Sequence, residues 1–263
     1  MRRLRYVMLL AALAGALIMA QGAYAHNLWL NPEEHYPEPG QTVDIEVAWG
    51  HEYPKDRTDE EVKEDRVQRI WAQDPEGEMV ELKQKSAAVY QLQVDKPGAY
   101  HIAANIEPGM FTTTPQGRKW ASKQEVERPI ECTAFEIMAQ SVVVAGGQEQ
   151  NLQASTGQPL EVILLDDPSR LQIGDTLRVR ILFEGQPLSD LKLGAMYAGY
   201  SGDTGHGAQD LPVQTKTNQE GEAELELDKK GHWMILLSHR TEYPDQEVCD
   251  ENTYNLALTL KIE

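Results

Sequence analysis

The sequence predicts an all-β protein with two immunoglobulin-like or transthyretin-like antiparallel β-sandwich domains behind a signal peptide. Three observations predict this fold: short segments alternate apolar with polar residues, glycine and proline turns separate them, and a pair of motifs recurs about half a chain apart. Short strands joined by such turns are typical of β-sandwiches.

The amino-terminal segment has the three parts of a secretory signal. Arginines at positions 2, 3 and 5 precede an apolar stretch over residues 7–20 and the small-residue box Ala23-Tyr24-Ala25. The apolar stretch is shorter than the roughly 20 residues that span a bilayer, and no second stretch of that length follows. We expect cleavage after Ala25, with an uncleaved anchor as the alternative. The product is a soluble periplasmic protein without stable membrane insertion.

The chain is strongly acidic. Its formal net charge is −18, and loss of the three leader arginines changes it to −21. Such a charge disfavours nucleic acid and anionic lipid as partners and suits cations. Most of these carboxylates are expected to serve solubility.

Two motifs occur twice. Asp-Lys-Pro-Gly-Ala-Tyr at residues 95–100 has a near copy, Asp-Lys-Lys-Gly-His-Trp, at residues 228–233. A Gly-x-Thr motif lies upstream of each copy, at residues 40–42 and 174–176. The two offsets, 133 and 134 residues, agree to within one residue. The sequence therefore predicts a duplicated module.

Five segments have the pattern of strands. Their apolar residues recur at every second position, the period of a half-buried strand, or follow a glycine turn. They are residues 42–47, 135–144, 177–181, 222–227 and 233–239.

These signals place a signal peptide at residues 1–25 and two domains at residues 26–150 and 158–263. Glycine-rich turns near residues 146–158 separate the domains. The one helical candidate, residues 59–69, is interpreted rather as a solvated helix or a disordered loop. A long insertion at residues 107–131 is either functional or disordered.

Cys132 and Cys249 are the only cysteines. In an oxidising compartment an isolated pair is expected to form a disulfide. The alternative, a thiolate that binds a soft metal, lacks the usual ligand spacing.

No catalytic signature occurs: neither a Gly-x-Ser-x-Gly elbow, nor a phosphate-binding glycine loop, nor a His-Glu-x-x-His helix. We therefore expect a binding protein rather than an enzyme. Its candidate ligands are histidines, whose neutral rings bind nickel, cobalt, copper and zinc.

His26 differs from the other histidines because cleavage gives it a second donor. The new α-amine and the ring Nδ1 can chelate one metal ion, with release of a proton from part of the population. The alternative is that this residue only marks the place where the peptidase cuts.

Three further histidines are candidate ligands. His51 follows Gly50 at the end of the first alternating strand, where a side chain can project from the sandwich edge. His239 shares a strand face with Trp233 by the two-residue alternation, opposite to the face of His232. His206 lies in a glycine-rich loop and could join a site on binding. Each has an ordinary surface or core role as its alternative, and we interpret His35 and His101 as structural.

The mature start His-Asn-Leu-Trp-Leu-Asn-Pro, Gly50-His51 and the Gly-His-Trp of residues 231–233 with His239 resemble a family of exported proteins encoded beside nickel and cobalt uptake transporters. The resemblance implies a periplasmic metal-binding subunit of an energy-coupling-factor type transporter, with histidine ligands that include the new amino terminus. It makes Ni²⁺ the expected ion, with Co²⁺ and Cu²⁺ as alternatives, and makes the membrane transporter subunits the expected partners.

Two other functions compete with nickel delivery. Copper(II) binds tightly to nearly any nitrogen site, so a periplasmic copper carrier is one. The other is an envelope adhesion or carbohydrate-binding module, in which the sandwiches only present loops.

Overall fold

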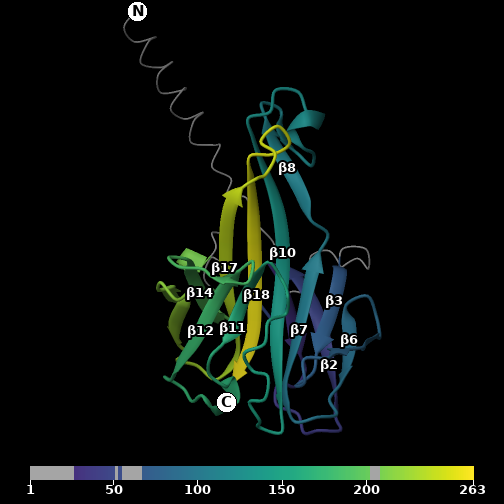
Figure 1. The fold of residues 1–263 in the computed structure, drawn as a ribbon, viewed down its shortest axis with the longest axis vertical. Helices are drawn as coiled ribbons and strands as arrows, with labels where there is room; N and C mark the ends of the chain where they lie inside the picture. The colour runs from purple at the N-terminus through teal and green to yellow at the C-terminus, as the bar shows by residue number, and fades with distance from the viewer. Residues whose placement is uncertain (1–26, 51–52, 55–66, 202–207) are drawn as a thin grey trace, which may run out of the picture.

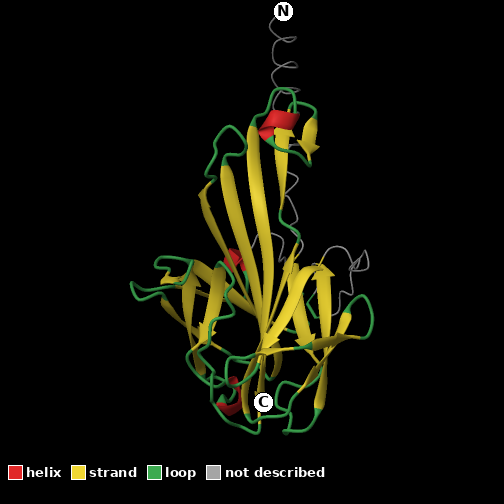
Figure 2. Ribbon diagram, turned by 45° about the vertical axis from the view of Figure 1, so that its right-hand side comes forward, coloured by secondary structure: helices red, strands yellow, loops and turns green. Residues whose placement is uncertain are grey.

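The computed structural model describes residues 27–50, 53–54, 67–201 and 208–263. These residues form strands β1 to β18 and three short 3-10 helices, η1 (Lys123–Glu125), η2 (Pro168–Arg170) and η3 (Ala208–Asp210), and they contain no α-helix (Figure 2). The predicted all-β class is confirmed.

The strands form three sheets. A four-stranded sheet of the first half has the order β1 (Asn27–Pro32), β2 (Thr42–Gly50), β6 (Val89–Gln93), β5 (Leu82–Gln84). In the second half, β11 (Leu160–Leu164), β12 (Thr176–Phe183) and β13 (Gln186–Pro187) form a sheet in which β16 (Glu222–Glu226) also pairs with β12.

The third sheet has ten strands and spans both halves. Its order is β15 (Val213–Lys216), β14 (Lys192–Tyr197), β17 (Gly231–Glu242), β18 (Glu251–Ile262), β10 (Glu131–Ala145), β7 (Gly98–Ile106), β3 (Val67–Gln73), β4 (Met79–Val80). Beyond this path, β8 (Gly109–Thr114) pairs with β10 and with β9 (Gly117–Lys119).

The two smaller sheets cover opposite faces of the shared sheet, as the alternation along β10 shows. Ala139 and Val143 lie in the hydrophobic core under the sheet of β1 and β2. Met138 and Val142, one residue away from each, lie in the core under β11 and β12. Since successive side chains of a strand point to opposite faces, one sandwich is built on each side of the sheet.

The duplication predicted from the motifs is visible in the structure. β10 and β18 run parallel, from Thr133↔Glu251 to Ser141↔Thr259, and each has an antiparallel neighbour, β7 or β17. Tyr100 on β7 accepts a hydrogen bond at its hydroxyl from the Lys96 amide, 2.9 Å away. Trp233 on β17 donates from Nε1 to the carbonyl of Lys229, also at 2.9 Å. In both copies the aromatic residue is therefore tied to the residue four positions before it.

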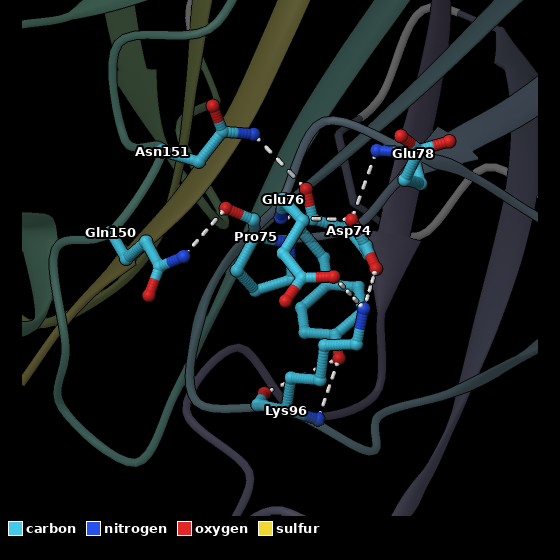
Figure 3. A network of polar contacts seen from close by, with 8 residues as sticks. Asp74, Pro75, Glu76, Glu78, Lys96, Gln150 and Asn151 are labelled. Atoms are coloured by element: carbon cyan, nitrogen blue, oxygen red, sulfur yellow. Dashed lines mark hydrogen bonds and ion pairs between the residues drawn. The ribbon is translucent and has the colours of Figure 1, made fainter.

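The turn after β3, residues 74–76, holds both the turn before β7 and the segment that connects the two halves (Figure 3). The Lys96 ammonium lies 2.6 Å from an oxygen of Asp74 and 2.5 Å from one of Glu76. The Asn151 side chain donates to the Asp74 carbonyl at 3.0 Å, and Gln150 donates to the Pro75 carbonyl at 3.1 Å. These contacts fix the connecting segment against the first half.

All five predicted strands are present, as β2, β10, β12, β16 and β17. The helical candidate is wrong over residues 67–69, which belong to β3 and pair with β7, from Val67↔Ile106 to Arg69↔Asn105 across an irregularity in the register. Residues 59–66 lie outside the described part. The division at residues 146–158 stays a prediction, and these residues form turns without a strand.

Strands β10, β17 and β18 extend beyond the sandwiches and form an arm with β8 at its tip (Figure 1). The predicted disulfide between Cys132 and Cys249 is present and joins β10 to the loop before β18. The insertion at residues 107–131 forms β8, β9 and η1 on this arm. No helix in the described part is long and apolar enough to cross a membrane.

Candidate functional site

The end of the β1–β2 ladder lies at the seam between the halves. The two strands pair from Pro32↔Ile45 to Asn27↔Gly50. Leu28 and Leu30 point into the core of the first half. Trp29, fully buried between them, points the other way and packs with Met234 of β17. The edge strand β1 therefore contacts the second half through its outer face.

Tyr53 closes this seam. Its side chain is buried, its ring meets the Trp29 ring edge to face with 6.0 Å between centroids, and its hydroxyl donates to the Trp233 carbonyl at 3.3 Å. Burial raises the pKa of the Tyr53 hydroxyl. The residue is thus a neutral anchor just beyond the end of β2.

Of the four predicted ligands, only His239 lies among the described residues. His26, His51 and His206 lie outside them. The described neighbours of the first two are Asn27 and Gly50, the last pair of the β1–β2 ladder.

His239 lies on the face of β17 that the alternation predicts. Trp233, on the same face, is in the core of the second half. His239 itself is half-buried at the rim, where its ring meets Phe183 with 4.5 Å between centroids and its strand partner is Tyr254. Burial lowers the pKa of His239. The face that contacts Trp29 is the opposite one, so β17 separates His239 from the seam.

Two histidines that the sequence left aside meet at the seam. His35, in the loop after β1, is 1% exposed, and its Nδ1 lies 3.1 Å from the Val142 carbonyl. The ring of His232 on β17 is 5.5 Å away between centroids. Burial lowers the pKa of His35 to about 4 and also lowers that of His232. Both rings are neutral at pH 7.

No local signal predicts this pair, because the two residues belong to different halves and meet only through tertiary packing. Within the described ranges, no group of three or more His, Cys, Asp or Glu side chains is placed to hold a metal ion. His101, interpreted as structural, is buried with its Nε2 2.7 Å from the Asn151 carbonyl.

A family model described as "Domain of unknown function (DUF4198)" matches residues 23–241. A search of curated protein sequences gave no match. Among solved structures, the D00-D0 domain of intimin is 13% identical, with 90% of this chain and 99% of that chain covered and a TM-score of 0.21. The Escherichia coli adhesin FdeC is 14% identical, with 92% of this chain and 65% of that chain covered and a TM-score of 0.21.

Proposed function

The chain belongs to the DUF4198 family, and from this premise we propose that it is a periplasmic protein that binds Ni²⁺, with Co²⁺ as the alternative, and delivers the ion to a membrane uptake transporter. The description of the family names no function, so the proposal is argued from the residues of this chain.

The register of β1 and β2 supports this proposal most directly. Asn27 pairs with Gly50 at the end of the ladder. The next residues of the chain at this end are His26, before Asn27, and His51, after Gly50. If the same pairing continued by one more residue pair, His26 and His51 would be opposite each other. Opposite residues of an antiparallel pair have Cβ atoms about 4.5–5.5 Å apart, close enough to bind one ion.

The donor chemistry suits reversible binding of nickel. His26, once it is the first residue, offers an amine and an imidazole nitrogen, and His51 offers a second imidazole. Nitrogen donors of this kind prefer borderline ions such as Ni²⁺, Co²⁺ and Cu²⁺ over Mg²⁺ or Ca²⁺. Water would complete the coordination shell and leave on delivery.

The disulfide supports export, and the negative charge of the chain suits a cation as its cargo. A disulfide between Cys132 and Cys249 is typical of an oxidising compartment. The net charge of −18 attracts cations. Copper(II) is the alternative cargo, because it binds nitrogen donors more tightly than nickel.

Titration of the mature protein with Ni²⁺ in a calorimeter tests which residues bind the ion. His51→Ala is expected to weaken binding at least tenfold. His239→Ala is the matched control, since His239 lies on the far face of β17, and His206→Ala tests the loop. Loss of binding in His239→Ala with none in His51→Ala would contradict a site at the ladder end.

Affinity alone does not identify the cargo, since copper binds nitrogen donors more tightly than nickel. The cargo is therefore tested by metal uptake into cells with and without this protein. Loss of the protein is expected to lower nickel or cobalt accumulation and to leave copper accumulation unchanged. Lower copper accumulation alone would replace the proposed cargo with its alternative.

A second candidate, an envelope binding module, is favoured by the tip of the arm. Trp120 is 74% exposed there, and its ring meets the rings of Phe111 and Phe135 edge to face, at 5.8 and 5.9 Å between centroids. Exposed tryptophan beside other aromatic rings is common where proteins bind partners. Trp120→Ala is expected to leave metal binding unchanged. If the protein is an envelope binding module, the same substitution is expected to abolish binding of its ligand.

A further inference from the structure

The seam between the halves contains a buried nitrogen atom without a partner. His35 Nε2 has no hydrogen-bond partner in the described part of the chain, although the side chain is 1% exposed. A buried polar atom left in this state costs about 1–3 kcal/mol, so native proteins usually satisfy such atoms with a protein group, a water molecule or a bound ion.

The other nitrogen of the same ring fixes its tautomer. The Val142 carbonyl can only accept a hydrogen bond, so His35 Nδ1, at 3.1 Å, carries the proton and donates it. The Nε2 lone pair is therefore free to bind a cation. This is the arrangement of most metal-binding histidines, which donate their second ring N–H to a carbonyl or carboxylate.

His232 supplies a second imidazole at a suitable distance. Its ring centroid is 5.5 Å from that of His35, and the rings are inclined by 58°. With metal–nitrogen bonds of about 2.0–2.1 Å and a ring radius of about 1.1 Å, two imidazoles at a tetrahedral angle have centroids about 5 Å apart. The observed spacing fits a tetrahedral ion better than a square-planar one, whose adjacent rings lie closer.

Two opposite charges act on the pair. Lys261 lowers the pKa of both histidines, and Glu34 raises it by a smaller amount. The Lys261 Nζ lies 4.0 Å from Glu34 and 3.2 Å from Glu263, so these two carboxylates offset part of its positive charge. An ion at His35 would bind against this remaining charge, through the lone pairs of two neutral rings.

We propose that His35 and His232 form a second metal site, distinct from the ladder end, in which two imidazoles from the two halves bind one tetrahedral divalent ion of the Zn²⁺ class with water as the remaining ligands. The proposal does not depend on the function of His26 or His51. A bound ion would link the loop after β1 to the start of β17.

Cobalt(II) alone is the probe, because tetrahedral Co²⁺ absorbs visible light strongly. All proteins in the test carry His26→Ala and His51→Ala, which remove the imidazoles proposed for the ladder-end site. The parent is expected to bind one Co²⁺ with a tetrahedral spectrum, and Zn²⁺ is expected to displace it.

His232→Gln, at a half-buried position, is expected to weaken cobalt binding at least tenfold and to remove the tetrahedral band; His35→Asn is expected to do the same. His239→Gln is the matched control, with no change. Absence of the band in the parent, or a band that persists in His232→Gln, would overturn the proposal and leave His35 Nε2 with water alone. Since the ladder-end site is blocked throughout, neither outcome bears on the proposed nickel function.

Discussion

The two copies of the repeated unit each have a histidine beside the aromatic residue that ties the strand to its turn. In the first copy it is His101, directly after Tyr100, and in the second it is His232, directly before Trp233. His101 has a carbonyl partner at 2.7 Å, whereas His232 faces His35, whose Nε2 has no partner in the described residues. The comparison teaches that burial alone does not mark a ligand. His35 differs from His101 because one of its ring nitrogens has a lone pair and no hydrogen-bond partner in the described residues.

The largest effect is expected from cutting the covalent link between the halves. The double variant Cys132→Ser, Cys249→Ser opens a loop of 117 residues and should lower the free energy of unfolding by about 2–5 kcal/mol. Urea unfolding followed by tryptophan fluorescence measures it. Reductant should lower the stability of the parent equally and leave the double variant unchanged; a parent insensitive to reductant would contradict the assignment.

Substituting the repeated aromatic residues, Trp233 and Tyr100, should lower the free energy of unfolding by smaller amounts that differ between the two copies. Trp233→Phe removes the hydrogen bond to the Lys229 carbonyl and leaves a cavity in the core, at a cost of about 2–3 kcal/mol. Tyr100→Phe, the matched change in the first copy, opens no cavity. It removes the hydrogen bond from the Lys96 amide at 2.9 Å and the longer one to the Lys96 carbonyl at 3.3 Å, and should cost about 1 kcal/mol. Equal losses in urea unfolding would contradict the predicted difference between the two copies.

The smallest effect concerns pH. Burial lowers the pKa of His101, so the unfolded chain takes up a proton near pH 6.5 before the folded protein does. The stability from this residue is therefore complete above pH 6.5 and falls as the pH decreases, by at most about 1.4 kcal/mol per pH unit. His101→Asn should reduce that slope in unfolding curves recorded with a chelator. An unchanged slope would mean that His101 titrates normally.

The strands were predictable because their signal is local. The alternation along residues 177–181 and 233–239 depends only on which face each side chain points to, and it correctly placed Trp233 and His239 on one face of β17. The duplication was predictable from short glycine motifs, and the disulfide was predictable from an isolated pair of cysteines.

The shared sheet was not predictable in the same way. The parallel pairing of β10 with β18 joins residues 118 positions apart, such as Thr133 and Glu251, and leaves no period in the sequence. The contact of His35 with His232 depends on this pairing, because it places a loop of the first half over a strand of the second. Sequence reasoning therefore found the candidate ligands at strand ends and missed the pair at the seam.

The central claim, a nickel site completed by signal cleavage, is tested most directly at the amino terminus. Mature protein that starts at His26 is titrated with Ni²⁺ beside a version with Gly-Pro before His26; proline has no amide proton to lose, so the new amine cannot form a chelate that reaches the imidazole. Removing one of two chelating donors is expected to weaken nickel binding at least tenfold and to change the number of protons released. Equal affinity of the two proteins would contradict the amino-terminal site.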